Sequence, residues 1–179
     1  MPFTTKIVFV FIVGKMDILI SLIISILSGL VVMSFSHKYY NKAKFFNAFN
    51  VFLQTVCTNT QFFQDDIKKI INAMPQNNNA SYNALINSYL KFLSENDQQK
   101  FSQNISTLTE LSALDKEKIC LFFYELGHTD NTTQLNSIQA LQKHIAERIQ
   151  ETKQEINTKA VLIQKLGIVL GMAIFILLL

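Results

Sequence analysis

Two apolar runs bracket this chain, and they constrain its fold more than any other feature. The first covers residues 18–35, and the second covers residues 166–179. The first run is roughly 27 Å long as a helix, which is close to the thickness of the hydrocarbon core of a bilayer. We therefore expect transmembrane helices at 16–36 and 161–179, with the segment between them tethered to one face of a membrane.

The lysines beside the two runs predict which side of the membrane that segment occupies. Because cytoplasmic loops carry an excess of Lys and Arg, lysines on the inner flank of both runs place residues 37–160 in the cytoplasm and both termini outside. These lysines are Lys38, Lys42 and Lys44 after the first run, and Lys153, Lys159 and Lys165 before the second.

Residues 1–15 contain a shorter apolar stretch, at 7–13, which is too short to span a bilayer. Lys15 and Asp17 separate it from the first run, and no small-residue cleavage site of a signal peptide follows it. Two interpretations stay open. Translation starts at Met16 and the preceding residues are an upstream mis-start, or they form an extra N-terminal segment.

The segment between the runs has the apolar spacing of helices and little of the alternation of strands. At about 120 residues it is long enough for one domain with a single core. We therefore predict an all-α protein, with a helical bundle at 37–160 whose first and last helices continue into the membrane segments. The expected core residues are Phe45, Phe46, Phe49, Phe52, Leu53, Val56, Phe63, Ile67, Ile70, Ile71, Met74, Tyr82, Leu85, Ile86, Tyr89, Leu93, Phe101, Ile105, Leu108, Ile119, Phe122, Phe123, Leu126, Leu135, Ile138, Leu141, Ile145, Ile149 and Ile156.

Polar residues and glycine mark the expected helix ends. Gly127 stands where a left-handed residue would end the helix over the preceding residues. Asn131 and Gln134 have the spacing of a capping box, from which one unbroken helix is expected to run to Leu179. The expected N-terminal caps of the earlier helices are Ser81, then Asn96 or Asp97, then Asp115.

The chain lacks the motifs of the main nucleotide-binding and hydrolytic families. No Walker A loop, dinucleotide glycine motif, nucleophile elbow or HExxH signature occurs. The histidines are scattered, and we interpret His128 beside Asp130 as a surface pair, not an acid–base pair. We therefore expect a protein that is not an enzyme, with no cofactor, no metal and no small-molecule substrate.

Charge and cysteine usage exclude two further classes. The net charge is +3, and Arg148 is the single arginine among 16 basic residues, so no arginine-rich stripe for nucleic acid is present. We expect Arg148 on a solvated helix face with Glu147 and Glu151. Cys57 and Cys120 lie far apart, and we expect them to be reduced core thiols.

Small residues recur inside both apolar runs. Ser21, Ser25 and Gly29 form a stripe at a spacing of four, and Gly167 and Gly171 form a GxxxG pair. Small faces let membrane helices approach closely. We expect these residues to pack the two segments on each other or on a partner membrane protein.

The C-terminal third of the chain resembles a known family. Leu126, Gly127, Thr129, Asp130 and Gln134 fit a Leu-Gly-x-[Ser/Thr]-Asp-x-x-x-Gln signature, and a Leu-Gly pair introduces the last apolar run. Together with the order of the elements, this resembles the stage III sporulation protein AB family of endospore-forming bacteria, most clearly over residues 113–179.

That resemblance implies a non-enzymatic platform in the mother-cell membrane around the forespore, part of a channel between the two cells. The family's helical domain is similar to that of type II secretion and type IV pilus platform proteins. The analogy implies docking of a cytoplasmic secretion-type ATPase, stage III sporulation protein AA-like, and contact with other membrane proteins of the channel. The signature residues would either contact this partner or hold the corner between two helices.

Two other functions are compatible with parts of this pattern. The alternative to a platform is a membrane-anchored helical sensor of the chemoreceptor type, which needs an outward-facing domain and a signalling region after the second span. A small lipid hydrolase needs catalytic groups near the bilayer surface, where the chain places only His37, Tyr39, Tyr40 and lysines. The charge bias and the missing motifs favour the platform.

Overall fold

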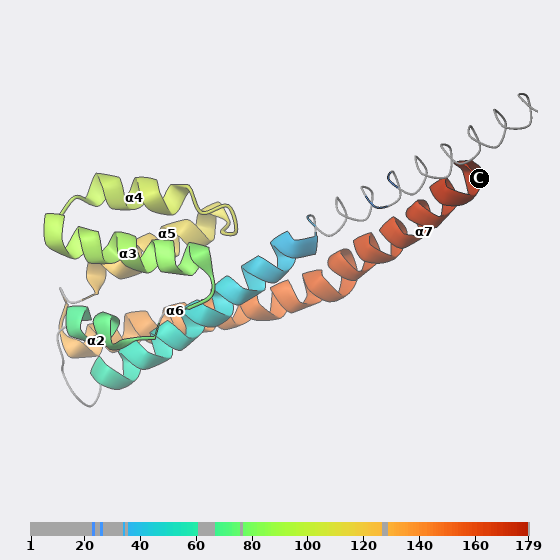
Figure 1. Ribbon diagram of the computed structural model, residues 1–179. Coiled ribbons are helices and arrows are strands. Elements are labelled where there is room, and N and C mark those ends of the chain that lie inside the picture. The colour runs from blue at the N-terminus through green and yellow to red at the C-terminus, as the bar shows by residue number, and fades with distance from the viewer. Residues whose placement is uncertain are drawn as a thin grey trace, which may run out of the picture. The chain divides into compact units, whose positions relative to one another are not determined.

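Every regular element in the part of the chain that the structure describes is a helix, in agreement with the apolar spacing of the sequence (Figure 1). The chain divides into two compact units, one formed by Tyr40–Lys153 and the other by Met1–Tyr39 with Gln154–Leu179. The computed structural model describes residues 23, 26, 34, 36–60, 67–75, 77–126 and 129–178.

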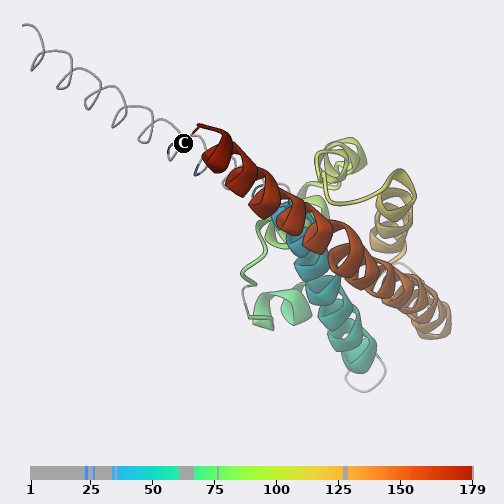
Figure 2. The same cartoon turned by 90° about the vertical axis from the view of Figure 1, so that its right-hand side faces the viewer.

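The unit Tyr40–Lys153 is a bundle of helices that begins within the helix over residues 36–60. In it α3 packs against α2 and α4, and α4 packs against α5. Figures 1 and 2 both show the helix over residues 36–60 beside α6. The remaining helices are α2 (Ile67–Ala73), α3 (Ala80–Glu95), α4 (Gln98–Ser106), α5 (Ala113–Glu125) and α6 (Asn131–Glu155).

Aromatic rings from four helices meet at the centre of the bundle. Phe123 of α5 lies 4.3 Å, between ring centroids, from Tyr89 of α3, and 5.7 Å from Phe101 of α4. Its ring also contacts Phe49 and Phe52 of the helix over residues 36–60. Each buried large apolar side chain contributes about 1.5–3 kcal/mol, and aromatic pairs add about 0.5–1.5 kcal/mol. This cluster therefore joins helices that are distant in sequence.

The core residues expected from sequence are confirmed over most of the bundle. Ile67, Met74, Ile86, Leu93 and Ile149 are partly buried and pack on the core, while Phe63 lies outside the described residues. Leu135 and Ile156 are only half-buried. The fully packed residues are Phe45, Phe46, Phe49, Phe52, Leu53, Val56, Ile70, Ile71, Tyr82, Leu85, Tyr89, Phe101, Ile105, Leu108, Ile119, Phe122, Phe123, Leu126, Ile138, Leu141 and Ile145.

The caps of α3 and α4 differ partly from expectation. The prediction that Ser81 caps α3 is wrong, because the Asn79 side chain accepts the hydrogen bond from Tyr82 N, at 2.8 Å. The Ser81 hydroxyl instead donates to Glu110, at 2.7 Å. Asn96 ends α3 in the left-handed region at φ 54°, where asparagine is tolerated better than most residues. Asp97 caps α4, as predicted.

The second unit contains the C-terminal apolar run. A π-helix, η1 (Ile156–Ala160), separates α6 from α7 (Val161–Leu178), so the predicted unbroken α-helix is wrong at this turn. In the described residues one helix, Thr132–Ala173, includes a stretch long and apolar enough to cross a membrane. The first predicted span lies almost wholly outside the described residues.

Candidate functional site

A cluster of polar side chains lies between α5 and α6. At its centre is the carboxylate of Asp115, whose side chain is 1% exposed. One oxygen, Oδ1, lies 2.9 Å from His144 Nε2 and 3.1 Å from Arg148 Nε. The other, Oδ2, accepts hydrogen bonds from Ser112 N, at 3.1 Å, and Ser112 Oγ, at 2.6 Å. Both carboxylate oxygens are therefore engaged by protein groups.

This geometry corrects two expectations from the sequence. Asp115 is not the N-cap of α5: Ser112 is the cap, and Asp115 is the third helical residue of a capping box. Arg148 is not on a purely solvated face. Its guanidinium contacts Asp115 and Glu151, and its Cζ atom lies 5.7 Å from the Phe46 ring centroid. Arg148 therefore links α6 to α5 and to the helix over residues 36–60.

The electrostatics of the cluster favour an ionised Asp115. Burial raises the pKa of the carboxyl group, since the charged form loses its water. Hydrogen bonds from Ser112 and His144 and the positive charge of Arg148 outweigh this penalty and hold the Asp115 pKa below its usual value. The carboxylate is therefore charged at neutral pH and joins the two helices.

The order of the groups in this cluster differs from that of a hydrolytic triad. In a triad a histidine lies between the serine and the carboxylate, and it takes the proton of the serine. Here Asp115 lies between Ser112 and His144, with hydrogen bonds to both. The contacts observed around Ser112 therefore fit a capping box and not an activated nucleophile.

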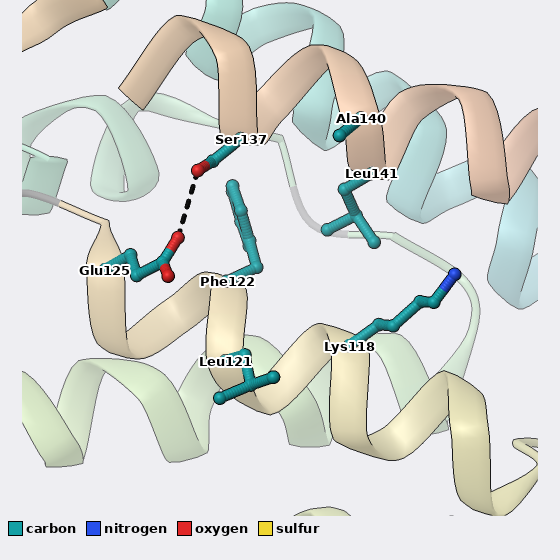
Figure 3. Close-up of a pocket in the computed structure, with 7 residues that line it drawn as sticks. All are labelled: Lys118, Leu121, Phe122, Glu125, Ser137, Ala140 and Leu141. Atoms are coloured by element: carbon teal, nitrogen blue, oxygen red, sulfur yellow. Dashed lines mark hydrogen bonds between the residues drawn. The ribbon is translucent and has the colours of Figure 1, made fainter. Parts of the chain in front are cut away.

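A shallow groove adjoins the cluster along α5 and α6 (Figure 3). It encloses about 260 Å³, and its lining is mainly apolar. Phe122 of α5 and Leu141 of α6 project toward each other, and Glu125 accepts a hydrogen bond from Ser137, at 2.9 Å. Lys118 connects groove and cluster, since its Nζ lies 3.3 Å from His144 Nδ1. The lining residues are Lys118, Leu121, Phe122, Glu125, Ser137, Ala140 and Leu141.

The residues of the Leu-Gly signature surround the corner between α5 and α6. Leu126 is buried, and its carbonyl oxygen accepts a hydrogen bond from Tyr89 Oη, at 3.3 Å. Gln134 is buried, and Thr129 has a buried hydroxyl with no hydrogen-bond partner among the described residues. Asp130 is exposed. Gly127 lies outside the described residues.

Asp130 acts on α6 through its side chain. Its carboxylate accepts hydrogen bonds from Thr133 N, at 3.0 Å, and Thr133 Oγ1, at 2.7 Å. Asp130 therefore caps α6, and the expected capping box from Asn131 to Gln134 is wrong, because Asn131 is already the first helical residue. These contacts support the interpretation in which the signature holds the corner. These contacts do not test the alternative, in which the exposed Asp130 contacts a partner.

The small residues expected to pack the membrane segments are described only in part. Gly167 and Gly171 are buried in α7, whereas Val169 and Leu170 between them are 58% and 59% exposed. The face of α7 that carries Gly167 and Gly171 is therefore buried, and the face that carries Val169 and Leu170 is exposed. The stripe Ser21, Ser25 and Gly29 lies outside the described residues.

Sequence reasoning missed both the polar cluster and the groove. The cluster joins residues that are 29 or more positions apart, but one signal was available. Arg148 continues the stripe of Ile138, Leu141 and Ile145 at helical spacing, so it belongs to the packed face of α6. No group of three or more metal-ligating side chains occurs among the residues described.

The fold and the last helix define a class of protein: an all-α bundle followed by an apolar helix of membrane-spanning length. The chain belongs to the stage III sporulation protein AB family, whose family model matches residues 17–179. It is therefore a protein of the stage III sporulation system. No curated protein and no solved structure matches it.

Proposed function

We propose that this chain is a non-enzymatic platform in the mother-cell membrane around the forespore, and that its bundle docks a cytoplasmic secretion-type ATPase. The observation that carries the proposal is the family match over residues 17–179, which assigns the chain to the stage III sporulation system. The platform role, the partner and the orientation follow from the resemblance to secretion platform proteins and from the lysines beside both apolar runs.

The bundle has features that suit a docking domain. The buried carboxylate of Asp115 contacts His144 and Arg148 of α6, and these two contacts hold α5 against α6. An apolar groove lies on the surface of the same helix pair. A rigid helix pair that presents an apolar groove is a common means of binding a partner helix. These features support a protein that offers a surface.

Orientation can be tested by labelling one cysteine from outside the cell. Cys57 and Cys120 are free and half-buried, so both would be replaced by alanine before Gln150, which is exposed, is changed to Cys. When the chain is expressed in the plasma membrane of vegetative cells, a membrane-impermeant maleimide should label Gln150→Cys only after the cells are permeabilised. Labelling of this cysteine in intact cells would contradict a cytoplasmic bundle.

Docking can be tested with the full chain in lipid nanodiscs and the purified ATPase of the stage III system. We expect a saturable complex, together with a change in ATP hydrolysis when the platform is added. The same nanodiscs without ATPase should hydrolyse neither ATP nor ester and phosphoester test substrates. The absence of any complex would remove the docking role, and turnover by the chain alone would contradict a non-enzymatic protein.

A further inference from the structure

The groove between α5 and α6 has a sharply defined chemistry. Leu121 on its α5 side is 53% exposed, although it is a large apolar side chain. The α6 side carries Ser137 and Ala140, which are small and leave space for an inserted side chain. Figure 3 shows Lys118 and Glu125 toward opposite ends of the groove, with the apolar residues between them. The surface therefore has an apolar centre and one charge of each sign.

The two charges set the polarity of any occupant. Lys118 and Glu125 are seven residues apart on α5, which is about 10 Å along a helix axis. Among the described residues, the Glu125 carboxylate accepts a hydrogen bond from one neutral hydroxyl, that of Ser137. A complementary occupant therefore presents a carboxylate to Lys118 and a cation to Glu125, about two helical turns apart.

A second copy of this chain does not fit that requirement. Asp115 at the start of α5 contacts Arg148 late in α6, and Glu125 at the end of α5 contacts Ser137 early in α6, so the two helices are antiparallel. A parallel pair of α5 helices related by a twofold axis would place Lys118 beside Lys118 and Glu125 beside Glu125.

An antiparallel pair of copies would place Lys118 of each copy beside Glu125 of the other. That arrangement conflicts with the membrane segments of the proposed function. It would put the C-terminal ends of the two α6 helices at opposite ends of the pair. Both chains continue from these ends into the segment that contains α7, which the proposed function places in one membrane for both copies. The occupant is therefore a different protein, whose helix does not continue into the membrane.

We infer that the groove between α5 and α6 binds an amphipathic helix of the ATPase partner, with an apolar ridge over Leu121 and Ala140 and with opposite charges at Lys118 and Glu125. The inference rests on the proposed function, which supplies the partner. An apolar ridge set into a groove between two helices, with charges at its ends, is a common mode of helix recognition.

The sharpest test compares two leucines of the same helix. Leu114 and Leu121 are both 53% exposed on α5, but only Leu121 lines the groove. In the full chain in nanodiscs, Leu121→Glu should weaken ATPase binding by about tenfold or more, as for a central interface residue. Leu114→Glu should change binding less than about twofold.

A second pair of variants tests the shape of the groove. Ala140→Leu fills the α6 side and should also weaken binding about tenfold, while Ala146→Leu, on an exposed part of the same helix, should not. A third pair tests the charges. Glu125→Lys should weaken binding and make binding depend less on salt concentration. The control is Glu117→Lys, because Glu117 is exposed and does not line the groove.

The outcomes separate the groove from the proposed function. If the unaltered chain binds the ATPase and both leucine variants bind equally, whether well or badly, the groove is not the site while docking stands. If the unaltered chain does not bind, the proposed function and this inference both fail. If Leu121→Glu instead dissociates an oligomer of the chain, the occupant is a second copy and the inference is overturned. Circular dichroism and thermal unfolding verify that each variant is folded.

Discussion

Asp115 Oδ1 and His144 Nε2 lie 2.9 Å apart, and this contact joins the first turn of α5 to the middle of α6. The carboxylate has two structural roles. Within α5 it completes the capping box with Ser112, and between helices it binds His144 and Arg148. The start of α5 and the position of α6 are therefore set by the same side chain.

Removing this carboxylate should destabilise the bundle. We expect Asp115→Ala to lower the free energy of unfolding by about 2–4 kcal/mol, because it leaves Arg148 and His144 without their buried partner and removes half of a capping box. Denaturant titration of the chain in nanodiscs measures the change. Asp97→Ala is the matched control, since Asp97 caps α4 from an exposed position. A loss no larger than that of the control would contradict the role between helices.

The same carboxylate should make stability depend on pH. Its pKa is held below the usual value in the folded chain, whereas in the unfolded chain a carboxyl group of this kind has a pKa of about 3.9. The unfolded chain therefore takes up the proton first as the pH falls. The stabilisation is fully present well above pH 4 and is lost as the pH falls through the folded value.

Unfolding measured from pH 7 down to about pH 3 should show this loss, and Asp115→Asn should reduce its steepness. The lowered pKa values of the exposed caps Asp97 and Asp130 contribute to the same acid range in both proteins. The difference between the two curves therefore isolates Asp115. Identical pH profiles for both proteins would show that this carboxylate gains no stabilisation from its partners.

Asp130 should contribute to the first turn of α6 and not to partner binding. Asp130→Ala removes the acceptor for Thr133 N and Thr133 Oγ1, so α6 should fray and the melting temperature should fall slightly. Asp130→Asn keeps a capping oxygen and should restore most of the loss. ATPase binding should be unchanged in both. A loss of binding in a fully folded Asp130→Asn protein would instead assign the signature a docking role.

The apolar spacing was sufficient to predict the helices and the core, because a stripe at intervals of three and four residues has few ways to be buried. The rings of Phe49, Phe52 and Phe123 are buried together, as such stripes require. The ends of the individual helices were harder to predict. Ser112 and Asp115 have the spacing of a capping box, yet either could begin the helix, and only the backbone geometry distinguishes them.

The polar cluster and the groove could not be predicted from the sequence, for a different reason. They depend on which residues of α5 face which residues of α6, and spacing within one helix does not give the register between two. His144 therefore appeared as one scattered histidine, although it contacts Asp115 and Lys118. Arg148 offered the one available signal, because a charged residue on an apolar stripe implies a buried partner of opposite charge, but we predicted it on a solvated face.

Gly167 and Gly171 should be intolerant of bulk, because both are buried in α7 while Leu170 beside them is 59% exposed. Gly171→Ile inserts a branched side chain where the helix face is covered, and overpacking of this kind costs about 1–3 kcal/mol. Thermal unfolding of the full chain in nanodiscs should therefore shift downward, and Gly167→Ile should act in the same direction.

Leu170→Ile is the matched control for these glycine variants, since it changes a neighbouring side chain without adding volume and its position is exposed. It should leave unfolding unchanged, because an exposed position accommodates either side chain. If Gly171→Ile and Leu170→Ile unfold at the same temperature, the buried face of α7 accommodates a larger side chain. The GxxxG pair then does not determine packing. If only the glycine variants lose stability, close packing at this face is required for the unit that contains α7 to form.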